Sequence, residues 1–438
     1  MSFDSSSPDE PTDSDPSQAS TTAGLRIALA HPKLRAWLIA GSIEWGAITF
    51  LAVALGYVVH EVTDSAIWLG VQVAALTAPY TLLSLHIGEA LDRFERRKLL
   101  LVGYVSELIL AAVLGLLYGV GLLNLPVILI ASLLFGILLT FEVPANWLVI
   151  QSYTPAEHLT SVFAVSSTMS NIAIAVSMII GGLTLATLGF GYVTVLYILA
   201  ATPVVFVILH QRKSPPVRPI KETTSPDPAT GLRETMRLAR RNKTLHTALI
   251  LIPLVGALIL PLLWQLPAMA DWAGGEVLLT AGLAAAAYAG AALVGPLMVW
   301  LGHRGVSMAR RVAVSFMVAA ITMAVAGLLG EGAQSPGRIV LLMTALLIIG
   351  ASLTVLTVNL TSAVQSNSPE EMRGRFLGLS GLFLDGLLPI AAVVWGITIH
   401  FVDFGYALGI AATILLLAII WRSRRPGFDA LSGRKAPQ

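Results

Sequence analysis

The sequence contains no cysteine and few charged residues, and both absences exclude whole classes of protein. Without cysteine the chain has no disulfides and no thiolate for catalysis or metal binding. Charged residues make up 12% of the 438 residues and apolar residues 56%, whereas a soluble domain is about a quarter charged. The mean hydropathy of +0.80 argues against a disordered chain, and the net charge of +2 gives no reason to expect a nucleic-acid partner. These values indicate an integral membrane protein.

Apolar runs long enough to cross a bilayer recur along the chain. A transmembrane helix needs about 20 apolar residues to cross about 30 Å of hydrocarbon. Strand-length alternation is absent, and lipid cannot satisfy exposed backbone groups, so these runs are predicted to be helices. The sequence therefore predicts an all-α membrane protein with twelve spans, at residues 36–59, 66–87, 99–122, 126–150, 160–187, 191–210, 246–270, 278–301, 312–330, 339–363, 376–400 and 405–421.

Lysine and arginine are confined almost entirely to one side of the predicted bundle. If the N-terminus is cytoplasmic, 26 of the 27 Lys and Arg fall in cytoplasmic segments, and Arg338 alone stands at an external end. This asymmetry follows the positive-inside rule, so we expect both termini in the cytoplasm and the spans in the cell (inner) membrane. The expected organisation is a tail at 1–30, a six-helix half at 31–210, a linker at 211–243, a second six-helix half at 244–421 and a tail at 422–438.

The two predicted halves repeat part of the same sequence. A shift of 214 residues places residues 151–152 on 365–366 and residues 190–192 on 404–406. Ten of 42 aligned positions are identical, where roughly three would be expected by chance. Two homologous halves in parallel orientation are typical of a transporter whose binding site lies between them.

Three loop segments resemble one family of transporters. Residues 88–97 resemble the G-x-x-x-D-R-x-x-R-R signature of the major facilitator superfamily, which follows the second span. Residues 154–159 and 368–375 resemble loops of the branch that includes macrolide efflux pumps and the enterobactin exporter. The resemblance covers roughly residues 33–421. It implies a fold of two pseudo-symmetric six-helix halves and transport by alternating access, as in drug:proton antiporters.

The same resemblance implies a conformational latch at the cytoplasmic loops. In the family, such a charged cluster holds one of the two rocking states. Gly88 would permit a tight turn at a helix end, and Asp92 could form ion pairs with nearby arginines at modest cost. A positive-inside anchor would explain the arginines equally well, but it would not explain Asp92. The candidate latch residues are Gly88, Asp92, Arg93, Arg96, Arg97, Glu371, Arg373 and Arg375.

The fifth span departs from the family pattern. Many antiporters of the superfamily carry G-P-x-x-G-G there, but residues 177–182 read Ser-Met-Ile-Ile-Gly-Gly. Ile174 stands where the branch often has an arginine. The sequence therefore leaves both antiport and uniport open.

Four carboxylates fall inside the predicted spans, which contain no lysine or arginine. An ionised acid in hydrocarbon costs about 2.5–3.5 kcal/mol. Such groups are expected to hold protons much of the time and to release them when water or a cationic substrate arrives. At 1.5 Å per residue, all four lie roughly 12–14 Å from the cytoplasmic ends of their helices. These candidates for proton coupling or substrate contact are Glu44, Glu142, Asp385 and Glu107.

The four acids are not equivalent. In the family fold, spans one and four line the central cavity, which favours Glu44 and Glu142 for coupling. Asp385 aligns with Asn171 across the repeat, so these two could face each other over the cavity. Glu107 lies in span three and is expected to be peripheral and to bond a neighbouring helix. For each acid, the alternative is a protonated group with a structural role.

Polar and aromatic side chains within the spans could complete a largely apolar pocket. For any one of them, ordinary helix packing is the simpler explanation. The candidates are Trp45, Asn146, Asn171, Gln265 and Asn359.

These patterns favour proton-coupled export of an amphipathic neutral or cationic organic compound. A highly anionic substrate would meet no counter-charge in the spans, and no G-x-x-x-x-G-K-[ST] loop for ATP is present. The alternatives are an importer or lysolipid transporter of the same fold, or a non-transporting scaffold. No catalytic cluster, cofactor motif or metal-binding histidine pair is present, so we do not expect an enzyme. The expected partners are a small-molecule substrate, protons and the lipid bilayer, with the chain as a monomer.

Overall fold

Every regular element that the structure describes is helical, and twelve helical segments are long and apolar enough to cross a membrane. The predicted all-α, twelve-span fold is thereby confirmed. Most of the expected tails, and the first part of the expected linker, lie outside the described residues. The computed structural model describes residues 30–93, 96–155, 158–210, 228–329, 335–369, 372–424, Phe428 and Leu431.

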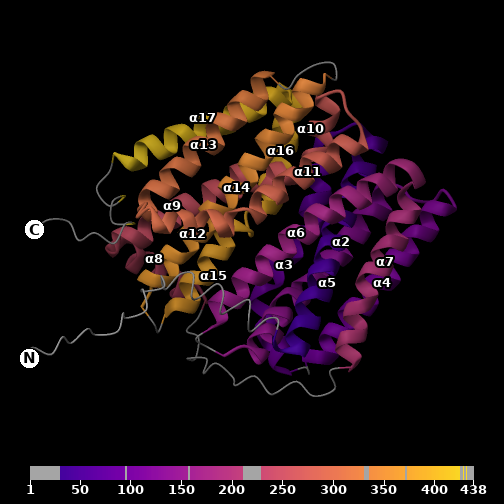
Figure 1. Ribbon diagram of the computed structural model, residues 1–438, viewed down its shortest axis with the longest axis horizontal. Helices are drawn as coiled ribbons and strands as arrows, with labels where there is room; N and C mark the ends of the chain where they lie inside the picture. The colour runs from indigo at the N-terminus through magenta and orange to yellow at the C-terminus, as the bar shows by residue number, and fades with distance from the viewer. Residues whose placement is uncertain are drawn as a thin grey trace, which may run out of the picture.

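Six long helices form the first half, drawn from indigo to magenta in Figure 1. Apart from their ends they are largely apolar all round, as expected for helices surrounded by lipid and by one another. In this half α2 packs against α6 and α7, α3 against α5, and α4 against α5 and α7. The helices are α2 (Pro32–Thr63), α3 (Ala66–Arg93), α4 (Arg96–Gly119), α5 (Leu125–Tyr153), α6 (Leu159–Leu188) and α7 (Phe190–His210).

The second half is divided into shorter helical pieces, drawn mostly in orange to yellow in Figure 1. Here α13 packs against α14 and α17, and α11 packs against α14. The pieces are α8 (Pro228–Arg241), α9 (Lys243–Leu254), η2 (Val255–Ile259), η3 (Leu260–Trp264), α10 (Leu266–Trp272), α11 (Val277–Ala292), α12 (Val294–His303), α13 (Met308–Leu329), α14 (Pro336–Asn367), α15 (Arg373–Leu384), α16 (Leu388–Val402) and α17 (Phe404–Ser423).

The second part of the linker folds as the amphipathic helix α8. Thr235 and Ala239 are buried on one side, whereas Arg237 and Arg240 on the other are exposed. The buried side packs against α9 and α15. The helical spacing of apolar residues in this segment is therefore explained by contact with the second half.

Three spans are interrupted where proline occurs, because proline lacks the N–H that the helix ladder needs. α9 ends just after Pro253, and a π turn and a 3-10 turn that contains Pro261 follow it. The eighth span breaks at Leu293, shortly before Pro296. The eleventh span breaks between α15 and α16, and Pro389 lies in the first turn of α16.

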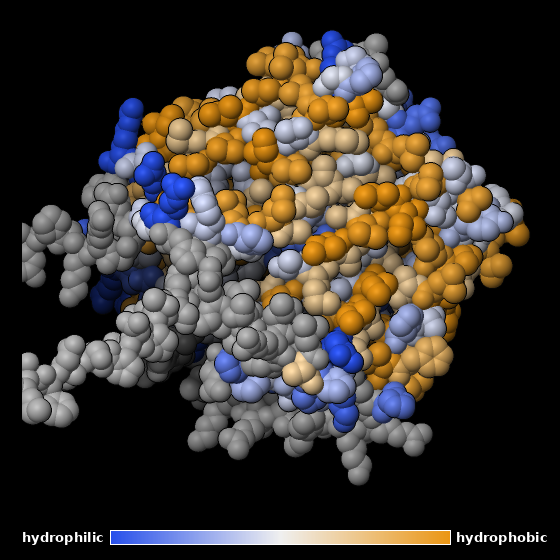
Figure 2. Space-filling view, in the orientation of Figure 1, coloured by the Kyte–Doolittle hydropathy of each residue, from blue (hydrophilic) through white to orange (hydrophobic). Residues whose placement is uncertain are grey.

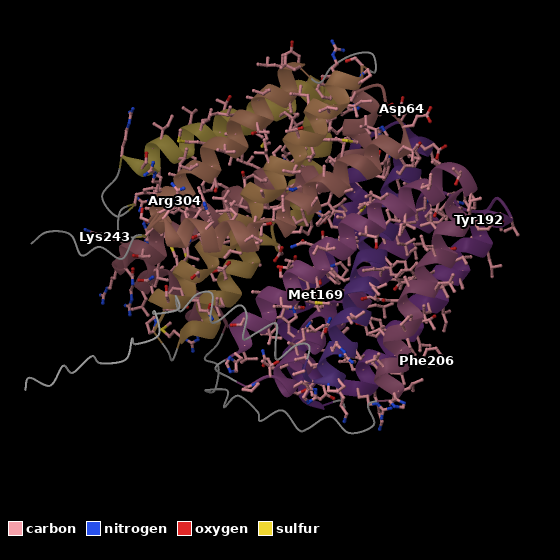
Figure 3. The ribbon with its side chains drawn as sticks, viewed as in Figure 1. Asp64, Met169, Tyr192, Phe206, Lys243 and Arg304 are labelled. Carbon is pink, nitrogen blue, oxygen red and sulfur yellow. The ribbon has the colours of Figure 1, made fainter. Side chains whose placement is uncertain are left out.

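The bundle has two ends, which we call the linker end and the far end. The linker end carries α8 and includes Lys243 and Arg304, and the far end includes Asp64, as labelled in Figure 3. The halves meet through α3 with α16 and through α6 with α11. A Cβ on Gly70 would overlap the Ala392 carbonyl, so the absence of a side chain lets these backbones approach closely.

The outer surface of the bundle is apolar. Figure 2 shows hydrophobic residues over much of the visible face of both halves. Large apolar side chains are strongly exposed, including Leu82 at 72%, Leu328 at 82% and Phe401 at 76%. Soluble proteins rarely expose this much apolar surface to water, whereas the surface of a membrane protein is covered by lipid. The exposed belt is consistent with a bundle surrounded by a bilayer.

The contact between α3 and α16 predicts the effect of adding one methyl group. Gly70→Ala would place a Cβ against the Ala392 carbonyl, so one of the two backbones must shift. Overpacking of this kind costs about 1–3 kcal/mol, and the unfolding temperature of the purified protein in detergent should fall. Gly103→Ala is the control, since nothing lies within 4 Å of its Cβ position. Equal unfolding temperatures for the two variants would contradict the close contact.

Candidate functional site

Three of the four acids predicted inside the spans converge in the first half. They are Glu44 on α2, Glu107 on α4 and Glu142 on α5, and one carboxylate oxygen of each lies within 4.8 Å of the others. Their exposed fractions are 0%, 0% and 3%. We call this buried group the carboxylate triad.

The triad forms because three helices present an acid at the same depth. The sequence placed all three acids at a similar distance from one end of the bundle. α5 packs against both α2 and α4, so side chains at one level on these helices can meet. Glu107, which was expected to be peripheral, is instead a full member. Trp45, next to Glu44, is half-buried and packs against the surrounding apolar core.

One hydrogen bond from a neighbouring helix reaches the triad. The hydroxyl of Tyr197 on α7 donates to Glu107 Oε2 at 2.8 Å, which is the kind of helix-to-helix bond expected for Glu107. Several other buried oxygens have no hydrogen-bond partner among the described residues. They are both oxygens of Glu44, Glu107 Oε1, Glu142 Oε2 and the hydroxyl of Tyr104.

Electrostatics restricts the charge that the triad can carry. Two unit charges no more than 4.8 Å apart repel each other by at least about 3.5 kcal/mol at an effective dielectric constant of about 20. In the described spans, Lys and Arg are confined to the first or last turns, so none lies at the depth of the triad to offset this repulsion. A protonated carboxyl group both removes a charge and gains an O–H that can donate to a neighbouring carboxylate. Protonation of one or more of these carboxylates is therefore the simplest way to reduce the repulsion and to give the unpartnered oxygens a hydrogen bond.

Asp385 occupies a different environment. It lies at the break between α15 and α16 and is exposed, unlike the three members of the triad. Tyr80, on α3 of the other half, is close enough to interact with it electrostatically. Asp385 therefore lies at the boundary between the two halves. Asn171, its counterpart in the repeat, is half-buried on α6.

The other polar candidates hold helices together within one half. Asn146 accepts a hydrogen bond from Trp37 Nε1 at 2.6 Å, which joins α5 to α2. Gln265 Nε2 donates to the Ala392 carbonyl at 3.2 Å. Asn359 Nδ2 donates to the sulfur of Met298 on α12 at 3.6 Å and to the backbone carbonyl one turn earlier in α14 at 2.7 Å. These bonds favour the packing explanation for all three residues.

Two candidate latch residues have described side chains. Arg97 Nε donates to the Ile208 carbonyl at 2.9 Å, and the guanidinium also donates to the Leu209 carbonyl at 3.2 Å. It thus caps the last turn of α7 in its own half, where cations are favoured. Arg375 is half-buried near the start of α15.

Little is described of the remaining latch candidates. Gly88 lies within α3, which continues to Arg93, so it does not mark the helix end that the sequence suggested. Glu371 lies outside the described residues. The same holds for the side chains of Asp92, Arg93, Arg96 and Arg373.

A groove of about 1000 Å³ opens at the far end between the two halves. α2 and α6 of the first half and α11 and α14 of the second contribute to its walls. Most of its lining is apolar, with leucines such as Leu185 and Leu279, but Glu61 and Glu276 also line it. The groove therefore combines apolar surface with negative charge.

Sequence reasoning missed the tyrosines around the acids. Tyr104 precedes Glu107 by one helical turn on the same face, a spacing that could have revealed it. Tyr197 and Tyr80 come from helices distant in sequence, and no local pattern connects them to an acid. Their roles follow only from how the helices pack.

The hydrogen bond to the triad predicts a stability difference between two tyrosines of α7. Tyr197→Phe removes the donor and leaves another buried carboxylate oxygen without a partner, so the protein should lose about 1–3 kcal/mol. Tyr192→Phe should leave the stability unchanged, since Tyr192 is 58% exposed and lies at the surface in Figure 3. Thermal unfolding in detergent measures both. A Tyr197→Phe variant as stable as the Tyr192→Phe variant would show that the bond contributes nothing.

Solved structures of several transporters share this fold. A D-xylose–proton symporter superposes with a TM-score of 0.72 at 14% identity, covering 92% of this chain and 99% of its own. The nucleoside transporter NupG gives 0.67 at 12% identity, with 90% and 100% covered. The peptide transporter POT gives 0.69 at 13% identity, with 93% and 99% covered. At such identities the likeness shows the fold alone. No match was found among curated protein sequences.

The sequence itself matches a family over most of its length. Residues 37–393 match the Major Facilitator Superfamily, in agreement with the twelve membrane-spanning helices. This match identifies the superfamily and no particular branch of it, so the resemblance to efflux pumps remains a prediction. The chain belongs to the Major Facilitator Superfamily of membrane transporters.

Proposed function

We propose that this transporter exports an amphipathic neutral or cationic organic compound in exchange for protons, by alternating access. The observation that carries the proposal is the carboxylate triad. Three buried acids within 4.8 Å of one another, with several unpartnered oxygens, favour a site that takes up and releases protons.

The enclosure of the triad supports a link between proton exchange and conformation. Glu44 and Glu107 have no exposed surface and Glu142 has 3%. Proton exchange with water therefore requires the helices around the triad to rearrange. A proton that binds one arrangement more tightly than another shifts the balance between them. This differential binding is what coupled transport needs.

The distribution of charge favours neutral or cationic substrates. In the described spans, Lys and Arg are confined to the first or last turns. The acids, in contrast, include the interior triad, Asp385 at the boundary between the halves, and Glu61 and Glu276 in the far-end groove. A strongly anionic compound would meet no counter-charge on its way through the bundle.

Sequence features support the direction of transport. Residues 154–159 and 368–375 resemble loops of an exporter branch. The positive-inside rule assigns the linker end to the cytoplasm, so the far end, where α3 and α16 meet closely, faces outward. The described conformation would then be one in which the halves are held together on the external side.

Two alternatives fit the same fold. An importer or lysolipid transporter would also use alternating access, with a different direction or substrate. A non-transporting scaffold would tolerate loss of the triad acids. Direction and dependence on the acids therefore distinguish these functions from the proposed one.

Transport in inside-out vesicles with an imposed pH gradient tests the proposal. A panel of cationic and neutral dyes and drugs serves as the substrates, and the parent should move at least one of them in exchange for protons. Glu44→Gln and Glu142→Gln should each reduce coupled movement at least about tenfold while the protein still folds. Asp403→Asn is the control, because this acid is exposed and lies outside both the triad and the far-end groove.

Three results would contradict the proposal. Transport by both triad variants at the parent's rate between about pH 6 and pH 8 would remove the coupling role of these acids. Movement driven by a sodium gradient and not by a pH gradient would make the triad a cation site. A folded parent that moves none of the compounds in either direction would favour the scaffold.

A further inference from the structure

A second cluster of potential ligands lies at the far end, where the halves meet. It consists of His60, Asp64 and Asp271, and one ligand atom of each lies within 4.8 Å of the others. His60 lies in the last turn of α2, and Asp64 is the residue that ends this helix. Asp271 lies in α10 of the second half. The cluster therefore joins the two halves.

The end of α2 brings its two members of the cluster together. Asp64 adopts the left-handed conformation, with φ of 47° and ψ of 40°, and its N–H donates to the His60 carbonyl at 2.7 Å. This αL cap folds the chain back over the last turn of the helix. α10 packs against α2, which brings in Asp271.

The imidazole ring of His60 makes no hydrogen bond among the described residues. Its side chain is 13% exposed, and both ring nitrogens are buried without a hydrogen-bond partner among the described residues. Nε2 lies 3.4 Å from Asp271 Oδ2, whose side chain is 66% exposed. A buried ring nitrogen that faces a carboxylate and lacks a hydrogen bond is suited to accept a further ligand.

The distances suit a tetrahedral metal ion. Zinc binds histidine nitrogen and carboxylate oxygen at about 2.0–2.2 Å, so two ligands of one ion lie about 3.3–3.6 Å apart. His60 and Asp271 already have this separation. Asp64 is exposed, so its side chain is free to turn toward them. One nitrogen and two oxygens leave a fourth position for water, as in zinc sites with three protein ligands.

The surroundings also favour a cation. Glu61 and Glu276 line the groove at the same end of the bundle. Among the described residues, Arg338 is the one Lys or Arg at the far end. The excess of acid raises the local concentration of cations. Imidazole together with carboxylates selects zinc over magnesium or calcium, which prefer ligand sets made of oxygen alone.

We propose that His60, Asp64 and Asp271 form a zinc site that bridges the two halves at the far end. Because its ligands come from both halves, bound zinc stabilises the arrangement in which these halves meet. The site is independent of the proton-coupling proposal, since it lies outside the carboxylate triad and its binding is measured without transport.

Calorimetric titration of the purified full-length chain with Zn²⁺, free of any histidine tag, tests the site. The parent should bind one Zn²⁺ and unfold at a higher temperature in its presence. His60→Ala and Asp271→Asn should each weaken binding roughly tenfold or more and abolish the thermal shift. His60→Cys should retain binding, because a thiolate is also a zinc ligand and the chain has no other cysteine.

Two controls make the result specific. His400→Ala removes another histidine near the far end, one that is exposed in the last turn of α16 and lies outside the cluster, and it should leave zinc binding unchanged. Ca²⁺ in place of Zn²⁺ should bind more weakly. Absence of saturable zinc binding in the parent would overturn the proposal. Equal affinity in the parent and in either ligand variant, once each is shown to be folded by its melting curve without zinc, would do the same.

Discussion

One constraint shapes the rest of the structure: in the part of the chain that the structure describes, three carboxylates share an apolar interior in which no lysine or arginine lies at their depth. Glu44, Glu107 and Glu142 come from three helices of the first half and meet within 4.8 Å. Hydrocarbon outside the bundle and apolar side chains within it offer no charge to balance them. Protonation is the simplest way to relieve the repulsion, and a site that must hold protons to stay buried can also respond to their supply. The coupling mechanism that we infer follows from this constraint.

The arrangement of the two halves relates the buried acids to transport. The halves contact each other through α3 with α16 and α6 with α11, where glycine allows the backbones to approach. Asp385 and Tyr80 are close enough across this boundary to interact electrostatically, while the triad lies within one half. Protons and substrate would therefore act at separate places, and the rigid packing of the first half would link them. The far-end cluster of His60, Asp64 and Asp271 lies on the same boundary.

Sequence alone predicted the parts that depend on local pattern. Span length and hydropathy predicted the twelve helices, and counting residues predicted a common depth for the acids. It could not predict that Glu107 joins Glu44 and Glu142, because the rotation of each helix and its choice of neighbour are set by packing between distant segments. The same holds for the hydrogen bond from Tyr197. The break at Asp385 was missed because residues 376–400 are long and apolar enough for one continuous span, and length and hydropathy do not show where such a span is interrupted.

Infrared spectroscopy of the purified protein tests the central claim most directly, because protonated carboxyl groups absorb separately from carboxylates. At neutral pH the parent should show protonated carboxyl groups in an apolar environment. A variant that combines Glu44→Gln, Glu107→Gln and Glu142→Gln should lose this signal, whereas Glu276→Gln, which changes an exposed acid, should keep it. If the parent and the triple variant have the same spectrum at neutral pH, the triad does not hold protons and the account is contradicted.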